Sequence, residues 1–268
     1  MVDAASTGLA LAVLPVKKSD IPASQVLAQK LGIPGLPSTT DPSCYENADA
    51  LLILEGDTLS LQQTGRKAPG PVSVDFGAAA MRHRRRSGHN ELLGRAVGVG
   101  KKDFLQVLDA TAGLGRDSFV LADLGCTVTL CERQPVIAEL LSWGLRQAVT
   151  SEDAWLADVA KRMSLLYRDT LATGLEEVTA VDVIYLDPMF PSRDKSAAVK
   201  KDMALFQLLL EGAPDDGHEL LAWALAAGVA RVVVKRPAKA DSLGGHAPSY
   251  SIQGKAVRYD VYVQRALA

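Results

Sequence analysis

Short apolar runs alternate with longer segments of helical spacing in the part of the chain that follows about residue 100. Strands that alternate with helices are the pattern of βαβ units, which build a parallel sheet. The expected strands are Phe104–Ala110, Thr127–Glu132, Ser164–Arg168, Val181–Leu186 and Arg231–Lys235, with a terminal antiparallel pair at Tyr250–Gln253 and Arg258–Val263. The expected helices are Gly115–Leu124, Pro135–Val149, Ala197–Leu210 and Glu219–Ala227. The pattern predicts a doubly wound α/β domain over residues 81–268.

Residues 1–80 follow a different pattern, in which shorter apolar runs are separated by turn residues. Ala50–Glu55 and Thr58–Gln63 flank Gly56-Asp57, a two-residue loop with glycine first, which is typical of a type II′ hairpin. The other expected elements are strands at Leu9–Val16 and Val72–Phe76 and a helix at Ala23–Leu31. We therefore expect a small α+β domain over residues 1–80.

The composition is that of an ordinary globular protein. Of the 268 residues, 48% are hydrophobic and 22% are charged, and the net charge is −2, so contact with nucleic acid requires a local basic patch. Leu9–Val16 is too short to span a bilayer and follows no basic region, which argues against a membrane anchor or a signal peptide. The three cysteines form no CxxC pair and the four histidines have no metal-ligand spacing. We expect a cytoplasmic protein without a metal site.

A glycine loop separates the first expected strand and helix of the larger domain. It reads Asp109-Ala-Thr-Ala-Gly113-Leu-Gly115-Arg116-Asp117. Glycines let the backbone pass close to a ligand, and the N–H groups of such a turn face the bound group. Ser118 stands where a dinucleotide fingerprint has its third glycine, which disfavours NAD. Glu132 ends the next strand, where a carboxylate can accept from both ribose hydroxyls. Together with Asp109, which precedes the glycines, these residues indicate a nucleoside-binding site.

A second motif, Leu186-Asp187-Pro188-Met189-Phe190-Pro191, follows a strand that we expect to be buried. Ligands of open α/β sheets bind at this end of the strands. The prolines stiffen the turn and expose the carbonyl of Pro188. An isolated Asp-Pro dipeptide favours a simple turn, with Phe190 filling the core. Because this turn follows a glycine loop and Glu132 in strand order, we interpret it as part of the same site.

The motifs of this chain resemble those of a known family. Asp-Pro-Met-Phe is a variant of the (Asp/Asn)-Pro-Pro-(Phe/Tyr) turn of S-adenosylmethionine-dependent enzymes that methylate exocyclic amines of bases. The set VDF, MRHRRRSG, LDATAGLGRDSFVLADLGC, LDPMFP, KSAAVKKDM and RVVVKRP lies within residues 72–263 and resembles the ribosomal RNA small subunit methyltransferase J family. The resemblance implies a Rossmann-like class I methyltransferase sheet with S-adenosylmethionine as cofactor. It also implies methylation of the N2 amine of a guanine in 16S ribosomal RNA, whereas residues 1–70 match far more loosely.

The resemblance further implies which residues contact the cofactor. The matching positions are Arg116 and Asp117 after the glycine loop, Glu132 and Arg133 after the second strand, Asp169 and Thr170 after the third, and Asp187 in the Asp-Pro turn. Asp169-Thr170 departs from the small hydroxyl pair expected there. Asp169 can still accept a hydrogen bond from the adenine amino group, so the expected role is kept.

The chemistry expected of this site needs positioning and neither a metal nor a nucleophile. The sulfonium of S-adenosylmethionine carries an activated methyl group, so the protein has to hold the amine nitrogen, the methyl carbon and the sulfur in line. The Asp187 carboxylate and the Pro188 carbonyl would accept hydrogen bonds from the guanine amine and stabilise the positive charge that grows on nitrogen. Phe190 would stack on the base, a contact worth about 1–3 kcal/mol. A paired base would first have to leave its stack.

Three groups of cationic residues are candidates for contact with RNA phosphates. The densest is the run Arg82-His83-Arg84-Arg85-Arg86, although such a run is also typical of a solvated face or linker. The candidate residues are Arg82, Arg84, Arg85, Arg86, Lys195, Lys200, Lys201, Lys235 and Arg236. We expect them to border one cleft at the carboxyl edge of the sheet, with 16S ribosomal RNA or the small ribosomal subunit as partner.

Three other functions stay open from the sequence. An amino-methyltransferase acting on adenine or cytosine of another nucleic acid needs the same acceptors, so only the resemblance selects guanine. An NAD-dependent oxidoreductase is disfavoured by Ser118 and by the lack of a His or Tyr placed as a proton relay. A non-catalytic RNA-binding module is disfavoured by an intact Asp187-Pro188 beside a complete glycine loop.

Overall fold

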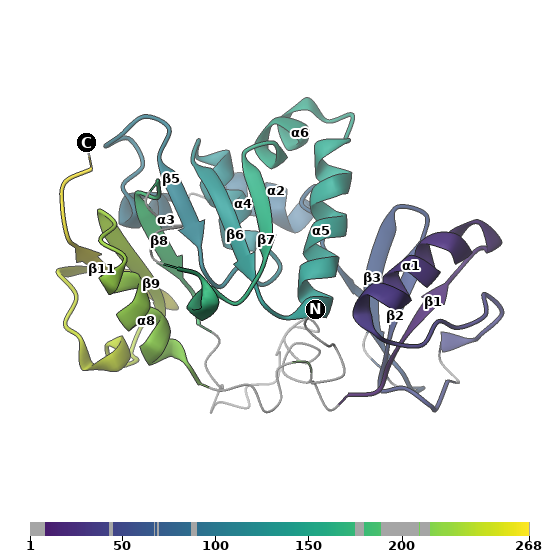
Figure 1. The fold of residues 1–268 in the computed structure, drawn as a ribbon. Coiled ribbons are helices and arrows are strands. Elements are labelled where there is room, and N and C mark those ends of the chain that lie inside the picture. The colour runs from purple at the N-terminus through teal and green to yellow at the C-terminus, as the bar shows by residue number, and fades with distance from the viewer. Residues whose placement is uncertain are drawn as a thin grey trace. The chain divides into compact units, whose positions relative to one another are not determined.

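The computed structural model describes residues 9–42, 45–66, 68, 70–86, 90–174, 180–188, 209 and 215–267 (Figure 1). These residues fall into two compact units. The first contains the chain up to Asp75 together with Gln134–Gln147. The second contains Phe76–Arg133, residues 148–188 and the residues from Asp215 onward. The expected helix at Ala197–Leu210 lies outside the described residues, apart from Leu209.

The second unit is built on a seven-stranded sheet. Its strands are β5 (Gln106–Asp109), β6 (Thr127–Glu132), β7 (Met163–Tyr167), β8 (Val183–Leu186), β9 (Arg231–Pro237), β10 (Tyr250–Gln253) and β11 (Val257–Val263). They lie in the order β10-β11-β9-β8-β5-β6-β7. β11 pairs antiparallel with β9 and β10, and the other pairs are parallel. The expected α/β fold class and its terminal antiparallel pair are therefore confirmed.

The strand order reverses between β5 and β8. From β5 the chain runs through β6 to β7, and it then returns to β8 on the other side of β5. Ligands of open α/β sheets bind outside the carboxyl ends of the strands at such a switch point. Because Asp109 ends β5 and Leu186 ends β8, the topology brings the glycine loop and the Asp-Pro turn to the same edge.

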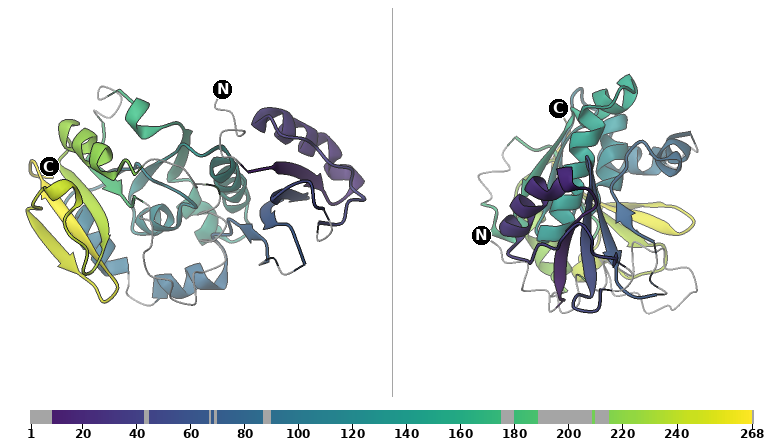
Figure 2. Two further views of the ribbon diagram at one scale, coloured as in Figure 1. Left: turned by 90° about the horizontal axis from the view of Figure 1, so that it is seen from below. Right: turned by 90° about the vertical axis from the view of Figure 1, so that its right-hand side faces the viewer.

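Helices cover both faces of the seven-stranded sheet (Figures 1 and 2). The helices of this unit are α2 (Ala79–Arg86), α3 (Asn90–Val97), α4 (Arg116–Asp123), α6 (Ala154–Ala160) and α8 (Gly217–Ala226), with 3-10 turns η4 (Thr170–Ala172) and η6 (Leu243–Gly245). α3 and α4 contact one face, and α8 packs against β8 and β9 on the other. Leu108 and Ile184 of the sheet form one buried core cluster with Leu221 of α8. None of the helices in the described ranges combines the length and apolar character that a bilayer crossing requires.

Some expected boundaries are wrong. Phe104 is not part of β5, because its φ of +52° lies in the left-handed region, which is incompatible with a strand. The strand expected at Val72–Phe76 ends at Ser73, and the Phe76 ring stacks on Phe119 at 4.8 Å between centroids. The sequence did not predict α2, α3 or α6. The other expected elements within the described residues are found, with small shifts at their ends.

The first unit contains a four-stranded sheet. Its elements are β1 (Leu11–Pro15), η2 (Lys18–Asp20), α1 (Ile21–Leu31), β2 (Ala50–Glu55), β3 (Thr58–Gln63), β4 (Val72–Ser73) and most of α5 (Pro135–Val149). The order is β1-β2-β3-β4, in which β1 and β2 are parallel and the other pairs are antiparallel. Gly56 has a φ of +56°, as a glycine-first hairpin turn requires.

Candidate cofactor-binding and active site

The glycine loop leaves room for a ligand at the carboxyl end of β5. Gly113 and Gly115 have φ values of +53° and +68°, which glycine adopts without steric cost, and α4 begins directly after Gly115. Among the residues that the structure describes, none beyond its chain neighbours lies within 4 Å of a Cβ atom added at Gly113. The backbone of the loop is thus open on the side where a bound nucleoside is expected.

Glu132 joins the end of β6 to this loop. One of its carboxylate oxygens accepts a hydrogen bond from the Gly113 N–H at 2.8 Å, and the residue is 9% exposed. The strand-end carboxylate therefore lies directly beside the glycines, and its contact with the ribose stays a prediction.

Asp109 lies underneath the loop. Its carboxylate accepts hydrogen bonds from the Ser118 hydroxyl and from the Thr111 N–H, the latter at 3.2 Å. Burial raises the pKa of Asp109 to about 7, although these two hydrogen bonds act in the opposite direction. The hydrogen bonds of this carboxylate to Ser118 and Thr111 hold the glycine loop in place. Its contact with the cofactor stays a prediction.

The Asp-Pro turn is tied to the same loop. The Asp187 N–H donates to the Thr111 hydroxyl at 2.6 Å, and the Asp187 side chain keeps 38% of its surface exposed. Pro188 is buried. Thr170 adds a further link, because its hydroxyl donates to the Ala110 carbonyl at 2.7 Å. The ends of β5, β7 and β8 are thus fixed relative to one another by short hydrogen bonds.

A cluster of charged side chains holds the Asp187 carboxylate through Lys235. Lys235 donates to Asp187 and to Asp117, each at 2.8 Å. Asp117 also pairs with Arg84 and accepts from the Tyr185 hydroxyl at 2.6 Å. These five residues, which we name the Asp117 cluster, come from α2, α4, β8, β9 and the Asp-Pro turn.

The charges of the Asp117 cluster oppose the effect of burial. Burial alone would raise the pKa of Asp117, but Lys235 and Arg84 hold that pKa well below its usual value. Burial raises the pKa of Asp187, and Lys235 limits the rise. The two carboxylates in turn raise the pKa of Lys235 above its usual value despite its burial. Lys235 is therefore held as a cation between two carboxylates.

A second group of charges lies at the ends of β6 and β7. Arg133 pairs with Asp216, which precedes α8, and its Nη1 lies 3.7 Å from an Asp169 carboxylate oxygen. Asp169 also caps η4 by accepting from the Leu171 N–H at 3.0 Å. The structure thus brings Arg133 and Asp169 together and adds Asp216, which no motif indicated, while contact of Arg133 and Asp169 with the cofactor stays a prediction.

The arginine run on α2 makes contacts within the protein. Arg82 pairs with Asp153 at 2.6 Å and Arg85 with Asp123 at 3.1 Å, and both guanidinium groups lie over the Trp155 ring. Arg84 belongs to the Asp117 cluster. Intramolecular pairing is the role that the structure displays for these three arginines, and phosphate contact stays a prediction.

The remaining predicted residues fall into three groups: those with a described side chain, one whose side chain is not described, and those outside the described ranges. Arg236 is buried and donates to the Asp241 carbonyl, and Arg116 is exposed at the start of α4. The side chain of Arg86 lies outside the described side chains. The predicted residues outside the described ranges are Phe190, Lys195, Lys200 and Lys201. In the ranges that the structure does describe, no three His, Cys, Asp or Glu side chains come together as a metal site.

The reversed strand order, the open glycine loop and the acids after β6 and β8 define a class of protein, the Rossmann-like methyltransferases that use S-adenosylmethionine. In agreement, the model of the family "Putative SAM-dependent methyltransferase" matches residues 39–264.

Comparison with individual proteins narrows the class to one family. The chain is 54% identical over 218 residues to the ribosomal RNA small subunit methyltransferase J of Thioalkalivibrio sulfidiphilus, covering 80% of this chain and 84% of that protein. It is 45% identical over 266 residues to the protein of the same name from Marinobacter nauticus, covering 97% and 92%. The crystal structure of the SAM-dependent methyltransferase NGO1261 from Neisseria gonorrhoeae is 35% identical, with a TM-score of 0.72 over 96% of this chain and 97% of that one. The chain belongs to the ribosomal RNA small subunit methyltransferase J family.

Proposed function

We propose that this protein transfers a methyl group from S-adenosylmethionine to the exocyclic N2 amine of a guanosine in 16S ribosomal RNA. The observation that carries the proposal is the hydrogen bond between the Asp187 N–H and the Thr111 hydroxyl, which ties the Asp-Pro turn to the glycine loop at 2.6 Å. The names of the relatives support a small-subunit RNA substrate. The proposal assigns the reaction to the cytoplasm, in keeping with the sequence.

The residues around the glycine loop fit a nucleoside cofactor. We assign the adenosine part of S-adenosylmethionine to the open backbone at Gly113, to Glu132 for the ribose hydroxyls and to Asp169 for the adenine amine. When bound, S-adenosylmethionine supplies a methyl group on a positively charged sulfur. The carboxylates of Glu132, Asp169 and Asp187 favour this cation by their charge.

Asp187 and Pro188 act on the amine that receives the methyl group. The Asp187 carboxylate and the Pro188 carbonyl accept its two N–H bonds, so the nitrogen lone pair is directed at the methyl carbon. As the new N–C bond forms, the amine gains positive charge, and a proton must leave the nitrogen to give the neutral product. The Asp187 carboxylate is the acceptor that we assign to this proton, because it is held at the site and burial raises its pKa.

Lys235 is the positioning residue for Asp187. Its ammonium group binds one Asp187 oxygen and is itself fixed by Asp117, so the carboxylate keeps one orientation. Because two carboxylates already engage this ammonium group, we assign it a positioning role in place of phosphate contact.

The test uses S-adenosylmethionine with a labelled methyl group and small ribosomal subunits that lack the modification, followed by identification of the labelled nucleoside. We expect the label in N2-methylguanosine. Label in a methylated adenosine or cytidine would select the alternative amino-methyltransferase, and absence of transfer by the wild-type protein would overturn the proposal.

A variant of Asp187 tests the site itself. Asp187→Ala should lower kcat on the order of 100-fold, because an acceptor that acts mainly in the transition state is lost. Its circular dichroism should match that of the wild type. Asp158→Ala removes an exposed carboxylate from α6 and serves as the matched control, with activity unchanged. Wild-type turnover in Asp187→Ala would remove Asp187 from the mechanism.

A further inference from the structure

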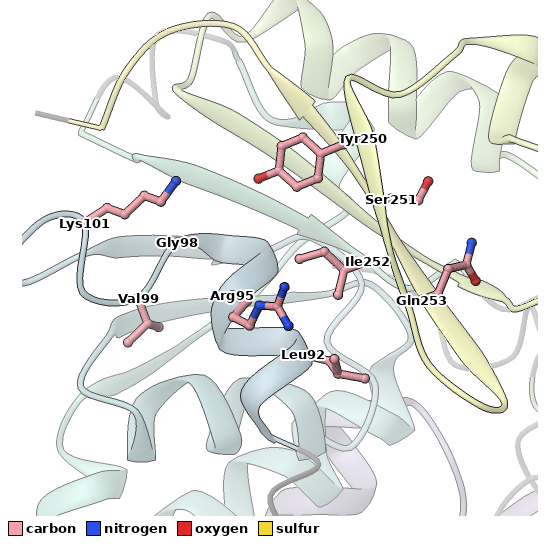
Figure 3. A pocket seen from close by; sticks show the side chains of 9 residues that line it. All are labelled: Leu92, Arg95, Gly98, Val99, Lys101, Tyr250, Ser251, Ile252 and Gln253. Atoms are coloured by element: carbon pink, nitrogen blue, oxygen red, sulfur yellow. The ribbon is translucent and has the colours of Figure 1, made fainter.

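A pocket lies between α3 and β10, at the end of the seven-stranded sheet that carries the antiparallel hairpin (Figure 3). Its volume is about 550 Å³. The residues that line it are Leu92, Arg95, Gly98, Val99, Lys101, Tyr250, Ser251, Ile252 and Gln253. Neither the glycine loop nor the Asp-Pro turn contributes to it, so the pocket is distinct from the site described above.

One wall of the pocket is aromatic and apolar. Side chains of a strand point alternately to its two sides, and Figure 3 shows Tyr250 and Ile252 on the side of β10 that faces α3. Leu92 and Val99 add apolar surface from α3 and the turn after it. The Tyr250 residue is 40% exposed, so its ring is accessible from the pocket.

The other wall carries positive charge. Arg95 on α3 and Lys101 in the following turn extend into the pocket (Figure 3). Within the described part of the chain neither side chain forms an ion pair or a hydrogen bond, and no carboxylate is among the lining residues. Two cations thus face an apolar, aromatic wall without a negative partner.

A buried arginine strengthens this positive charge. Arg231 is 5% exposed, and its Nη1 donates to the Ala96 carbonyl at 3.3 Å and to the Tyr250 hydroxyl at 3.5 Å. Its Nε has no hydrogen-bond partner, and no described carboxylate pairs with the residue. A Cβ atom at Gly98 would lie 2.7 Å from that Nη1, so glycine is needed for the guanidinium to pack there. A buried cation without a counter-ion is costly, and an anion in the adjacent pocket would offset part of this cost.

We propose that this pocket binds an unpaired nucleotide of the RNA substrate, with its base on the Tyr250 ring and the neighbouring phosphates at Arg95 and Lys101. Every base has a face that can stack on an aromatic ring, but only an unpaired base exposes it. Proteins bind single strands in grooves that combine cations, which contact the phosphates, with aromatic rings, on which the bases stack. The identity of the ligand as RNA rests on the proposed function. The pocket would hold the substrate at a second point, away from the reacting base.

The test measures binding of the full-length protein to a fluorescent oligouridine of about ten nucleotides, which contains no guanosine. Tyr250→Leu should raise Kd about 5-fold to 150-fold, because stacking is lost, whereas Tyr250→Phe keeps the ring and most of the affinity. Arg95→Ala combined with Lys101→Ala should weaken binding and lower the slope of log K against log salt by about 1.4, the value for two phosphate contacts. Lys18→Ala combined with Lys161→Ala removes two other exposed cations and is the matched control, with Kd unchanged.

S-adenosylhomocysteine affinity, measured on each variant, separates this inference from the proposed function. Weaker oligouridine binding with wild-type S-adenosylhomocysteine affinity supports the pocket as an RNA site. An unchanged Kd and salt slope in both pocket variants would overturn it, and so would displacement of the oligonucleotide by equal concentrations of uridine monophosphate or inorganic phosphate, which would indicate a small-anion site. Failure of the wild type to methylate RNA would refute the proposed function and leave the oligouridine comparison valid.

Discussion

Asp109 illustrates how little a single residue type says about its role. The sequence places an acid before the glycines, which suggests contact with a cofactor. In the structure its carboxylate is 2% exposed and is held by Ser118 and Thr111. The same Ser118 that argues against a dinucleotide thus has a positive role, because it supplies a hydrogen bond to a buried acid.

The raised pKa of Asp109 gives a testable pH dependence of stability. The carboxyl titrates near 3.9 in an unfolded chain and at about 7 in the folded one. Its contribution to stability is therefore full below pH 3.9 and is lost as the pH rises towards 7. Asp109→Asn cannot ionise, so its free energy of unfolding relative to wild type should increase over this window, by up to roughly 4 kcal/mol.

Urea unfolding at pH 4 and at pH 8 measures this difference. Asp158→Asn, at an exposed position of α6, controls for the loss of a carboxylate. A stability difference between Asp109→Asn and wild type that is the same at both pH values would show that Asp109 is not the titrating group.

At the scale of elements, the apolar strands were predictable, whereas the arginine-rich helix α2 was not. The buried strand β8 is an apolar run, and β6 alternates threonines with buried apolar residues over Thr127–Leu130, so both can be recognised without knowledge of the fold. α2 has no apolar stripe in its sequence. Its arginines instead bind Asp153, Asp123 and the Trp155 ring, which are remote in sequence. Such a helix is stabilised by tertiary contacts, so its residues resemble a solvated charge run until the partners are known.

The effect of a side chain in the glycine loop can be compared with its effect at a glycine of similar conformation outside the site. Gly113 in the loop and Gly56 in the β2–β3 hairpin have nearly the same φ, +53° and +56°, and a Cβ at either position would meet no atom of another described residue within 4 Å, its chain neighbours aside. Gly113→Ala and Gly56→Ala should each cost about 1–2 kcal/mol in the free energy of unfolding, the price of a left-handed alanine.

Of these two variants, only Gly113→Ala should weaken binding of the cofactor. The added methyl group at Gly113 projects into the space assigned to S-adenosylmethionine, so Gly113→Ala should weaken S-adenosylhomocysteine binding by about tenfold or more, a loss of at least roughly 1.4 kcal/mol. Gly56→Ala should bind like the wild type. Calorimetric titration of both variants tests this, and equal affinities would mean that the backbone at Gly113 does not face the cofactor.

At the scale of the whole molecule, the sequence predicted where the site lies but not how it is held. Strand order and the rule for parallel sheets place Asp109, Glu132 and Asp187 at one edge, as the structure shows. The hydrogen bonds that hold Asp109 and Asp187 run through Thr111, and Tyr185 holds Asp117 in the neighbouring cluster; no motif assigned either partner a role. Polar partners of this kind depend on side chains that meet only after folding, so a sequence pattern contains no signal for them.

The Asp117 cluster connects the candidate active site to the rest of the second unit. It links α2, α4, β8 and β9 to the Asp-Pro turn through buried or half-buried charges. Lys235 is central, because its ammonium group contacts both carboxylates. The charges with the largest effect on the pKa of Asp187 are those of Lys235, Asp117 and Arg84, of which Asp117 opposes ionisation of Asp187 while the two cations favour it.

Replacement of Lys235 should therefore change the pH dependence of methyl transfer. In Lys235→Met, burial and the negative charge of Asp117 both raise the pKa of Asp187 without opposition from Lys235, so the acid limb of the kcat–pH profile should move to higher pH. kcat at its optimum should also fall, on the order of 10-fold to 100-fold, because the carboxylate loses its fixed orientation. Lys235→Arg keeps the charge and should leave the acid limb near that of the wild type. If the acid limb of Lys235→Met coincides with that of Lys235→Arg while kcat falls in both, then Lys235 acts through packing alone. A shift of the acid limb in Lys235→Met alone would show that the charge of Lys235 sets the protonation state of Asp187.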